Sequence, residues 1–440
     1  MTFIRTRAGF SAAIFALASS FALSSPSAAA GLLQSASPAD VQAAGQGSTM
    51  GNLVLRSRIA RLDIGELARH VAPLNMDTAP DRIERARALD GIISIELFPG
   101  TTAIFKRKSV EEIGDSGYAW VGQVNGSPLN YASLIVENGE VTGHIQLAHR
   151  VFQIEPLSNG LYRVTELDQS KFPPDDPPGR HIQDAPAQRL APENPAAPRA
   201  KTQVRVLIAY TTAARNAAGG SIKMTAQIKQ AVSLANIGYS NTGIPLQVVL
   251  AKIMPAGTYV EQSDIAVDLN RLDGSSPGFL ANVRAQRELV KADLVSLFRK
   301  SDPNFCGIGN LTDHPGAATK NFAYHVMNWT CISNLSFHHE MGHNMGLRHD
   351  YYVDPTPGVR YNHGYVNRTA QCLVRTVMAY NNDCVDHGTS CTRINAFSTG
   401  AFVYGTNRCK IGIKKSGTLK RMDNTQRLKE TRATIGNYRN

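Results

Sequence analysis

One stretch decides the fold and chemistry expected of this chain: Phe337-His338-His339-Glu340-Met341-Gly342-His343-Asn344-Met345-Gly346-Leu347-Arg348-His349-Asp350. His339 and His343 are four residues apart, so in a helix they lie on one face and can reach a single Zn²⁺ ion. Gly346 is expected to end the helix, because glycine takes a positive φ at low cost. The reversed chain then brings His349 to the ion as a third ligand. Three protein ligands leave one position for water, which is typical of a catalytic zinc site.

Glu340 directly follows the first of these histidines and projects beside the metal rather than onto it. A carboxylate placed there can act as the general base for a zinc-bound water. The structural alternative is a core helix with hydrogen-bonded histidines. A glycine and a third histidine at fixed offsets make a chance match rarer by roughly three orders of magnitude. His338 points away from the ligand face, so we expect it to be solvated or to support the ligands from behind.

The run HExxHxxGxxHD in residues 339–350 resembles the motif of the metzincin zinc endopeptidases, and Asp350 is typical of their adamalysin, or reprolysin, branch. Thr376-Val377-Met378-Ala379-Tyr380 is similar to the methionine turn of that family. The resemblance extends over residues 204–439 and is strongest to bacterial secreted enzymes of the peptidyl-Asp metalloendopeptidase type. It implies that Met378 forms an apolar floor under the three imidazoles and that Asp350 is buried and hydrogen-bonded.

The resemblance leaves two features of the site open. Tyr380 lies where the astacin and serralysin branches place a tyrosine that reaches the zinc, whereas Asp350 marks another branch. Tyr380 therefore either contacts the zinc or the oxyanion, or it only packs. Peptidyl-Asp enzymes cut on the amino side of Asp, which implies a cation in the pocket for the residue after the cut. Arg393 or Arg375 could supply that cation.

The order of segments predicts a secreted precursor. Residues 1–30 have a charged start, an apolar middle and the small-residue end Ala28-Ala29-Ala30, as in a signal peptide. We expect a β-rich, propeptide-like domain in residues 31–171, a Pro-rich linker in 172–201 and a zinc metallopeptidase catalytic domain in 202–440. No later stretch approaches 18 apolar residues, so no membrane span is expected. The predicted location is extracellular or periplasmic.

Hydrophobic periodicity predicts an α/β catalytic domain. From residue 204 onward, apolar strand-length runs alternate with helical spacing, which favours a twisted, mostly parallel sheet. The resemblance to metzincins adds an antiparallel edge strand. The long active-site helix and the methionine turn complete this metzincin-type fold. Asn321–Met327 is expected to be the edge strand that pairs with an extended substrate. Residues 92–167 instead alternate with a period of two, which predicts antiparallel strands. A short charged helix is expected in residues 81–89.

Charge and cysteine usage divide the chain at the same place. The first 200 residues contain 18 Lys and Arg against 20 Asp and Glu, and the remaining residues contain 28 against 15. All six cysteines lie in the second part, and an even number in a secreted chain predicts disulfides. We expect neighbours to pair, as Cys306–Cys331, Cys372–Cys384 and Cys391–Cys409. No Cys-x-x-Cys pair is present, so a second, structural zinc site is not expected.

The linker contains the run Pro173-Pro174-Asp175-Asp176-Pro177-Pro178, which predicts an extended and protease-accessible segment. Many metzincins stay latent because a propeptide cysteine binds the zinc. The first 200 residues here contain no cysteine, so that switch is unavailable. Asp175, Asp176 or His181 could bind the zinc instead.

The sequence thus predicts a secreted zinc endopeptidase made as a zymogen, with one catalytic Zn²⁺, protein or peptide substrates, and its own propeptide as inhibitor. No nucleic-acid partner is expected. Ca²⁺ could also bind, but no pattern assigns a calcium site. An inactive zinc-containing binding protein or adhesin is the alternative from another class, and the presence of Glu340 argues against it. A zinc amidase is a second alternative, which the expected edge strand disfavours.

Overall fold

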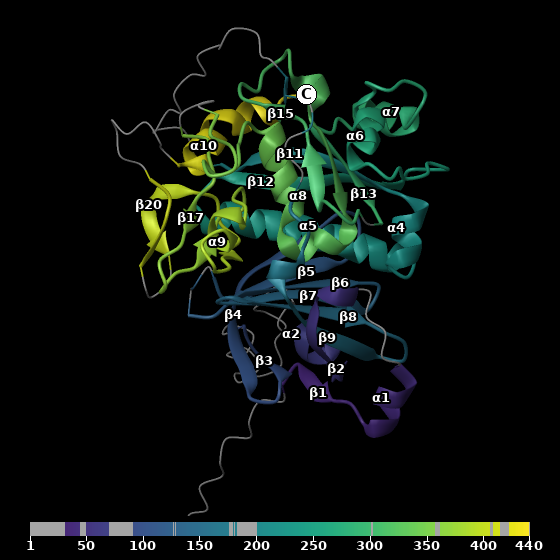
Figure 1. Ribbon diagram of the computed structural model, residues 1–440. Coiled ribbons are helices and arrows are strands. Elements are labelled where there is room, and N and C mark those ends of the chain that lie inside the picture. The colour runs from purple at the N-terminus through teal and green to yellow at the C-terminus, as the bar shows by residue number, and fades with distance from the viewer. Residues whose placement is uncertain are drawn as a thin grey trace, which may run out of the picture.

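The structure is a computed structural model that describes residues 31–44, 50–69, 91–125, 127, 129–175, 179, 181–182, 200–300, 302–356, 361–404, 408–413 and 422–439. The predicted signal peptide, the charged helix in residues 81–89, Asp176 and most of the Pro-rich linker lie outside the described residues. A β-rich N-terminal part lies beneath a part that mixes helices and sheets (Figure 1).

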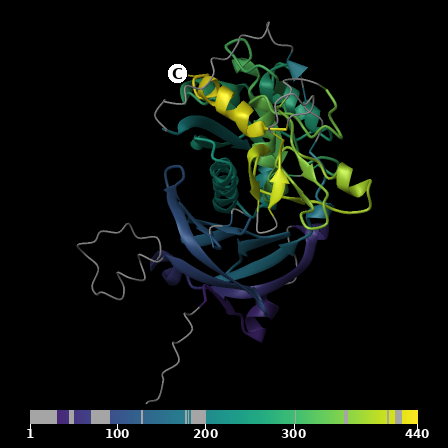
Figure 2. The same ribbon diagram turned by 90° about the vertical axis from the view of Figure 1, so that its left-hand side faces the viewer.

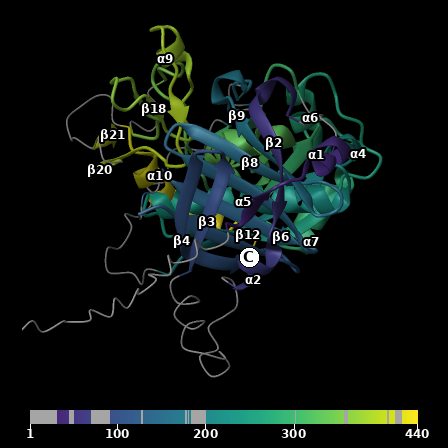
Figure 3. The ribbon, with the colours of Figure 1, turned by 90° about the horizontal axis from the view of Figure 1, so that it is seen from below.

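The N-terminal part is built on one antiparallel sheet with the strand order β1-β2-β9-β8-β7-β6-β5-β4-β3. Its strands are β1 (Leu33–Ser35), β2 (Val54–Leu62), β3 (Ile92–Phe98), β4 (Thr101–Glu112), β5 (Tyr118–Gln123), β6 (Tyr131–Glu137), β7 (Glu140–Leu147), β8 (Arg150–Pro156) and β9 (Leu161–Leu167). Short helices α1 (Pro38–Ala44) and α2 (Ile64–Arg69) accompany the sheet. The sheet curves beneath the rest of the molecule (Figure 2), and several of its strands face the viewer from below (Figure 3). The prediction of a β-rich N-terminal region is confirmed.

Strand β6 shows why this sheet is buried on both faces. Ala132 and Leu134 belong to the core of the N-terminal part, whereas Tyr131 and Ile135 belong to the core of the α/β part. Successive side chains of a strand point to opposite faces, so this alternation places one face of the sheet against its own core and the other against its neighbour. Ser133, on the second face, hydrogen-bonds across to Ser233 at 2.8 Å.

The α/β part contains a five-stranded sheet with the order β12-β11-β13-β16-β14. Its strands are β11 (Thr202–Tyr210), β12 (Leu246–Pro255), β13 (Leu294–Arg299), β14 (Gly307–Gly309) and β16 (Tyr324–Asn328). The first four in that order run parallel, and β14 pairs antiparallel with β16. The predicted mostly parallel sheet with an antiparallel edge strand therefore agrees with the observed strand pairing.

Helices cover both faces of this sheet. They are α4 (Thr212–Ala217), α5 (Ser221–Asn241), α6 (Ile265–Asp273), α7 (Ala281–Leu289), α8 (Ser336–Asn344) and α10 (Asn424–Ile435). Helix α9 (Asn382–Val385) is a single turn in the segment between α8 and α10. Along β11, Val206 and Ile208 pack in the core that contains α5, α8 and α10, whereas Leu207 and Ala209 pack with α6 and α7. Helix α5 lies directly above β5 and β6 and so joins the two parts of the molecule (Figure 1).

The predicted edge strand is placed one strand too far inward. Asn321–Met327 largely coincides with β16, which is bonded to β13 on one side and to β14 on the other. The edge belongs to β14, which consists only of Gly307, Ile308 and Gly309. A three-residue strand with two glycines carries too little β-propensity to be recognised from sequence.

Two of the three predicted disulfides are wrong. Cys306–Cys331 is present, but the other four cysteines pair as Cys372–Cys409 and Cys384–Cys391. All six cysteines are therefore paired. Helix α9 and the turn after it fold Cys391 back onto Cys384, where the backbone N–H of Cys391 donates to Asn381 Oδ1 at 2.8 Å. The loop closed by Cys384–Cys391 therefore lies within the longer loop closed by Cys372–Cys409.

The chain between the active-site helix and α10 forms short strands: β17 (Val366–Asn367), β18 (Val374–Arg375), β19 (Thr392–Arg393), β20 (Thr399–Tyr404) and β21 (Cys409–Ile411). Strand β18 pairs with both β17 and β19. Within the part of the chain that the structure describes, no helix has the length and apolar character needed to cross a membrane.

Candidate active site

Helix α8 places two histidines one turn apart on the same face. The rings of His339 and His343 lie 5.0 Å apart, measured between centroids. The opposite side of the helix is anchored in the core by Met341. Gly342 allows close packing, because a Cβ there would lie 2.5 Å from the sulfur of Met378. The helix is thereby seated directly on the predicted methionine turn.

A turn brings the third histidine to the same point. Gly346 has φ of +92°, and the side-chain amide of Asn362 donates to its carbonyl oxygen at 2.8 Å. His349 then lies with its Nε2 at 3.2 Å from Nε2 of His339 and at 3.0 Å from Nε2 of His343. Two ligands at about 2.0–2.1 Å from a tetrahedral ion are separated by roughly 3.3 Å, so these spacings suit a shared metal.

Backbone carbonyls fix how the imidazoles are protonated. The Nδ1–H group of His339 donates to the carbonyl of Val377 at 2.8 Å, and that of His343 donates to Leu347 at 2.9 Å. With the proton held on Nδ1, the lone pair of Nε2 is directed toward the metal position. The carbonyl of His349 accepts from Nδ1 of His363 at 2.8 Å, which holds the loop that carries the third ligand.

Burial keeps these three side chains neutral. It lowers the pKa of His343 to about 4 and lowers the pKa values of His339 and His349 well below their usual range. The neighbouring positive charge of Arg393 and the other imidazoles act in the same direction on His339. Neutral imidazole is the form that binds a metal, so all three rings are available as ligands at neutral pH.

Glu340 lies between this cluster and the edge of the sheet. Its side chain is buried, and a Cβ added to Gly307 of β14 would lie 2.7 Å from its Oε1. A Cβ added to Gly309 would lie 2.8 Å from the backbone oxygen of Glu340. Both glycines are therefore required for the close approach of β14 to α8. The sequence analysis missed them, although the spacing Gly-x-Gly after Cys306 was visible.

The supporting residues surround the imidazoles. Met378 is fully buried, with its sulfur next to Gly342 of α8. Asp350 is buried and accepts hydrogen bonds from the backbone N–H groups of Tyr380 at 2.8 Å and Tyr352 at 3.1 Å. The ring of Tyr380 packs 4.2 Å from that of His349, and its hydroxyl donates to the backbone carbonyl of Asp175.

Comparison with known proteins agrees with this geometry. Residues 200–398 match Reprolysin_5, the Metallo-peptidase family M12. The matched segment makes up a little less than half of the chain. The chain is 29% identical over 381 residues to a peptidyl-Asp metalloendopeptidase of Stenotrophomonas maltophilia (strain R551-3), which covers 81% of this chain and 85% of that protein. It is 28% identical over 317 residues to one of Xanthomonas campestris pv. campestris, covering 71% and 70%.

Among solved structures, metalloproteinase-II from Bacteroides fragilis aligns with a TM-score of 0.39 and 10% identity over 59% of this chain and 81% of that one. This similarity is weak. The family match and the sequence relatives confirm the enzyme class predicted from the sequence, a zinc metalloendopeptidase.

Both arginines proposed for the substrate pocket lie in one pocket of about 260 Å³. Its lining residues are Gln169, Ser170, Phe172, Pro173, Pro174, Asn334, Arg375, Tyr380, Asn381, Asn382, Val385, Asp386 and Arg393. Arg375 donates to the carbonyls of Cys391 at 3.1 Å and Ala379 at 2.8 Å. Arg393 is only 1% exposed and donates to the carboxylate of Asp175 at 2.7 Å.

The linker of the metallopeptidase follows the edge of its sheet. The backbone N–H of Cys306 donates to the carbonyl of Pro174 at 2.7 Å, and that of Gly179 donates to Gly309 at 2.9 Å. Strand β10 (His181–Ile182) then pairs parallel with β15 (Leu311–Thr312). The described part of the linker is therefore packed against the α/β part, whereas the sequence favoured an exposed segment.

The two described candidates for a latency ligand, His181 and Asp175, lie in different parts of the structure. Nε2 of His181 lies 2.9 Å from the carboxylate of Asp313, away from the three imidazoles. Oδ2 of Asp175 lies 3.6 Å from Nδ1 of His339, the nitrogen that faces away from the metal position. His338, on the other face of α8, is fully buried and bonds to Asn395 at 3.0 Å, so the solvated alternative for this residue is wrong.

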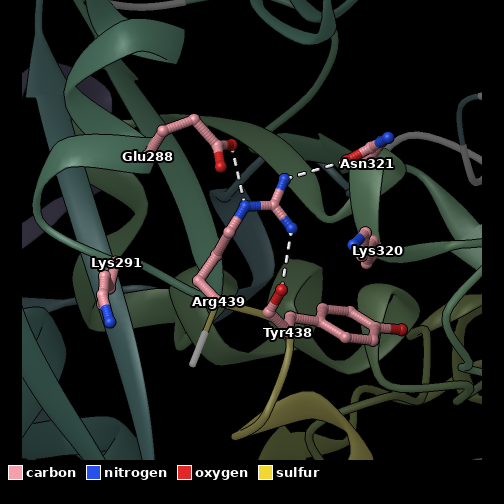
Figure 4. Close-up of a pocket in the computed structure, with 6 residues that line it drawn as sticks. All are labelled: Glu288, Lys291, Lys320, Asn321, Tyr438 and Arg439. Carbon is pink, nitrogen blue, oxygen red and sulfur yellow. Dashed lines mark hydrogen bonds and ion pairs between the residues drawn. The ribbon is translucent and has the colours of Figure 1, made fainter.

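A second pocket, of about 490 Å³, lies far from these residues in the fold and is shown in Figure 4. Arg439 lies across it and donates to Glu288 at 2.7 Å and to Asn321 at 2.9 Å (Figure 4). None of the metal-binding candidates or the two buried arginines lines it. We therefore do not assign the chemistry of the enzyme to this pocket.

Proposed function

We propose that the chain is a secreted zinc endopeptidase made as a zymogen. His339, His343 and His349 would hold the zinc, and Glu340 would be the general base. The observation that carries this proposal is the convergence of three buried Nε2 atoms, two of them oriented by backbone carbonyls, beside a fourth residue with a carboxylate.

The donor set fits zinc better than it fits calcium or magnesium. Three neutral imidazoles suit Zn²⁺, whereas Ca²⁺ and Mg²⁺ prefer oxygen ligands. When bound, zinc would polarise the scissile carbonyl and lower the pKa of the attacking water. The groups that could hold a metal among the described residues include these three histidines together.

Glu340 would accept the proton of the attacking water and pass it to the departing amine. Its burial removes competing solvent, which strengthens its interaction with charge that develops nearby. The open edge of β14 would bind the main chain of the substrate. The hydrogen bonds from Cys306 and to Gly309 made by the linker support this role, because they occur where an extended peptide would pair.

The zymogen part of the proposal is supported by the packing of the linker and of the N-terminal sheet against the catalytic domain. Three disulfides accord with an oxidising compartment and so with secretion. The relatives are peptidyl-Asp metalloendopeptidases, and two buried arginines lie in the pocket beside the site. We therefore also propose a preference for an acidic residue after the cut.

Casein digestion by the secreted, processed protein tests the function. Activity should disappear with a chelator and return with Zn²⁺. Glu340→Gln should retain one zinc per chain by metal analysis and lose digestion. Zinc binding without hydrolysis of any peptide by the wild type would favour the inactive binding protein, and hydrolysis restricted to cell-wall amides would favour the amidase.

A further inference from the structure

We propose that Asp175 occupies the specificity pocket of the uncut chain, where its carboxylate stands opposite Arg393 in place of the acidic side chain of a substrate. The inference rests on the proposed endopeptidase function and deepens it. It assigns Arg393 as the residue that recognises the substrate's acid, and it assigns the N-terminal linker as the segment that blocks this recognition before maturation.

Contacts of Asp175 place it inside the site rather than near it. Its Oδ2 accepts from Nη1 of Arg393 at 2.7 Å, and both side chains are almost completely buried. Its backbone carbonyl accepts from the hydroxyl of Tyr380. Ligand atoms of Asp175, His339 and Glu340 all lie within 4.8 Å of one another. Any substrate that reaches the catalytic residues must therefore displace Asp175.

The charge balance of the pocket explains why an acid is needed there. Arg375 bonds only to carbonyl oxygens in the described structure, and Arg393 also donates to the carbonyls of Asn334 and Ala379. Asp350 is occupied by backbone N–H groups. Without Asp175, Arg393 would lose the carboxylate to which it donates, and an unpaired guanidinium is costly in a desolvated site. An incoming acidic side chain would restore the balance, whereas a neutral one would not.

A substrate carboxylate could bind Arg393 more tightly than Asp175 does. Nε of Arg393 and Oδ1 of Asp175 have no hydrogen-bond partner within the described residues, so their pair is held through a single N–H···O contact. A free carboxylate can engage a guanidinium through two parallel hydrogen bonds, which are stronger. Asp175 can therefore compete with a substrate carboxylate only because the linker is attached to the rest of the chain.

That attachment comes from both ends of the segment. Before Asp175, the side chain of Gln169 accepts from the backbone N–H of Arg393 at 2.9 Å, and His149 bonds to Thr392 at 3.1 Å. After Asp175, the backbone N–H of Gly179 donates to Gly309 of the edge strand at 2.9 Å. The N-terminal part thus holds strand β19 and delivers Asp175 at high effective concentration. Cleavage of the linker would remove this advantage.

The position of Asp175 indicates that it fills the pocket and does not bind the metal. The carboxylate of Asp175 lies on the Nδ1 side of His339, and Nδ1 is already bonded to Val377. The metal position lies on the Nε2 side. Binding of the linker should therefore depend on Arg393 and not on zinc.

A fluorescent peptide with the sequence of residues 172–179 provides the test. Its binding to the processed enzyme, measured by fluorescence anisotropy, should persist after zinc is removed. Asp175→Asn in the peptide should weaken binding by about 30-fold or more, as expected when one partner of a buried charge pair is lost. Asp176→Asn is the matched control and should change binding by less than about threefold.

Two outcomes would overturn the proposal. One is that both Asn peptides bind equally, and the other is that binding disappears with the zinc, as metal ligation requires. Failure of the wild-type enzyme to cleave any peptide would instead refute the proposed function and would leave the anisotropy result intact. The two failures are thus distinguishable.

Full-length variants test the same contact within the chain. Asp175→Asn should raise the activity of the uncut precursor by about tenfold or more, because the linker then competes less well with an acidic substrate. Asp168→Asn removes a nearby carboxylate that bonds to Ser170 and should leave the precursor latent. The idea fails if intact Asp175→Asn precursor, checked by mass spectrometry, is as latent as the wild type while the processed enzyme is active.

Discussion

Replacing Gly307 by alanine should remove activity while leaving the metal and the fold in place. The new Cβ would lie 2.7 Å from Oε1, 2.8 Å from Cγ and 3.0 Å from Cδ of Glu340. Ordinary contact begins near 3.4 Å, so the carboxylate must move by about 0.7 Å. Cγ must shift with it, and the whole side chain is buried.

Catalysis is less tolerant of such a shift than folding is. A displacement of about 1 Å in a catalytic group can cost about 100-fold in rate, so we expect kcat of Gly307→Ala to fall by about 30- to 100-fold. Zinc content should stay at the wild-type value, because the three atoms nearest to the new methyl group all belong to Glu340 and none to the three histidines. The unfolding free energy should fall by about 1–3 kcal/mol, as for other overpacking substitutions, which leaves the folded state dominant.

The assay is steady-state hydrolysis of a quenched-fluorescence peptide by the processed enzyme, with metal analysis and urea unfolding on the same samples. Gly316→Ala is the control, since a Cβ there would lie 3.8 Å from the nearest atom, the carbonyl of His314. A Gly307→Ala enzyme with wild-type kcat would refute the reasoning. Loss of zinc together with activity would show that the edge strand supports the metal site rather than the base.

Three further predictions concern other parts of the molecule. Glu340→Gln should lower kcat by at least about 1,000-fold with KM little changed, measured on the same peptide, because the general base is lost. Gly342→Ala would place a Cβ 2.5 Å from the sulfur of Met378, and it should destabilise the protein by about 1–3 kcal/mol in urea unfolding. Burial lowers the pKa of His144 from 6.5 to about 3, so the unfolded chain binds the proton more readily than the folded one. This residue's contribution is complete above pH 6.5 and falls by about 1.4 kcal/mol per pH unit toward pH 3, and His144→Gln should make unfolding curves at pH 7 and pH 4.5 differ less than in the wild type.

His144 also shows how closely the two parts of the molecule depend on one another. Its Nδ1 lies 3.2 Å from the hydroxyl of Ser333 in the α/β part, and its Nε2 lies 3.1 Å from the hydroxyl of Tyr131 in the N-terminal sheet. Tyr131 in turn accepts from the amide of Asn395, the partner of His338. A buried polar network therefore runs from the N-terminal sheet to the active-site helix. Lowering the pH should weaken this interface, because His144 binds a proton more readily in the unfolded chain than in the folded one.

The errors of prediction share a physical origin. Cys384–Cys391 closes within a single turn after α9, while Cys372–Cys409 encloses it, and sequence spacing does not distinguish nested from adjacent pairs. The edge strand was misplaced because β14 has almost no side chains of its own. Burial of His338 follows from α5 and Asn395 approaching from distant parts of the chain.

By itself, the sequence determined what depends on local spacing: the face shared by His339 and His343, the glycine that ends α8, and the alternation that makes the N-terminal part β-rich. These features need only the geometry of one helix, one turn or one strand. The tertiary structure alone decided which strand forms the edge and that Asp175 meets Arg393 across 218 positions of the chain. Such contacts depend on how whole layers pack, and no local pattern encodes the packing of layers.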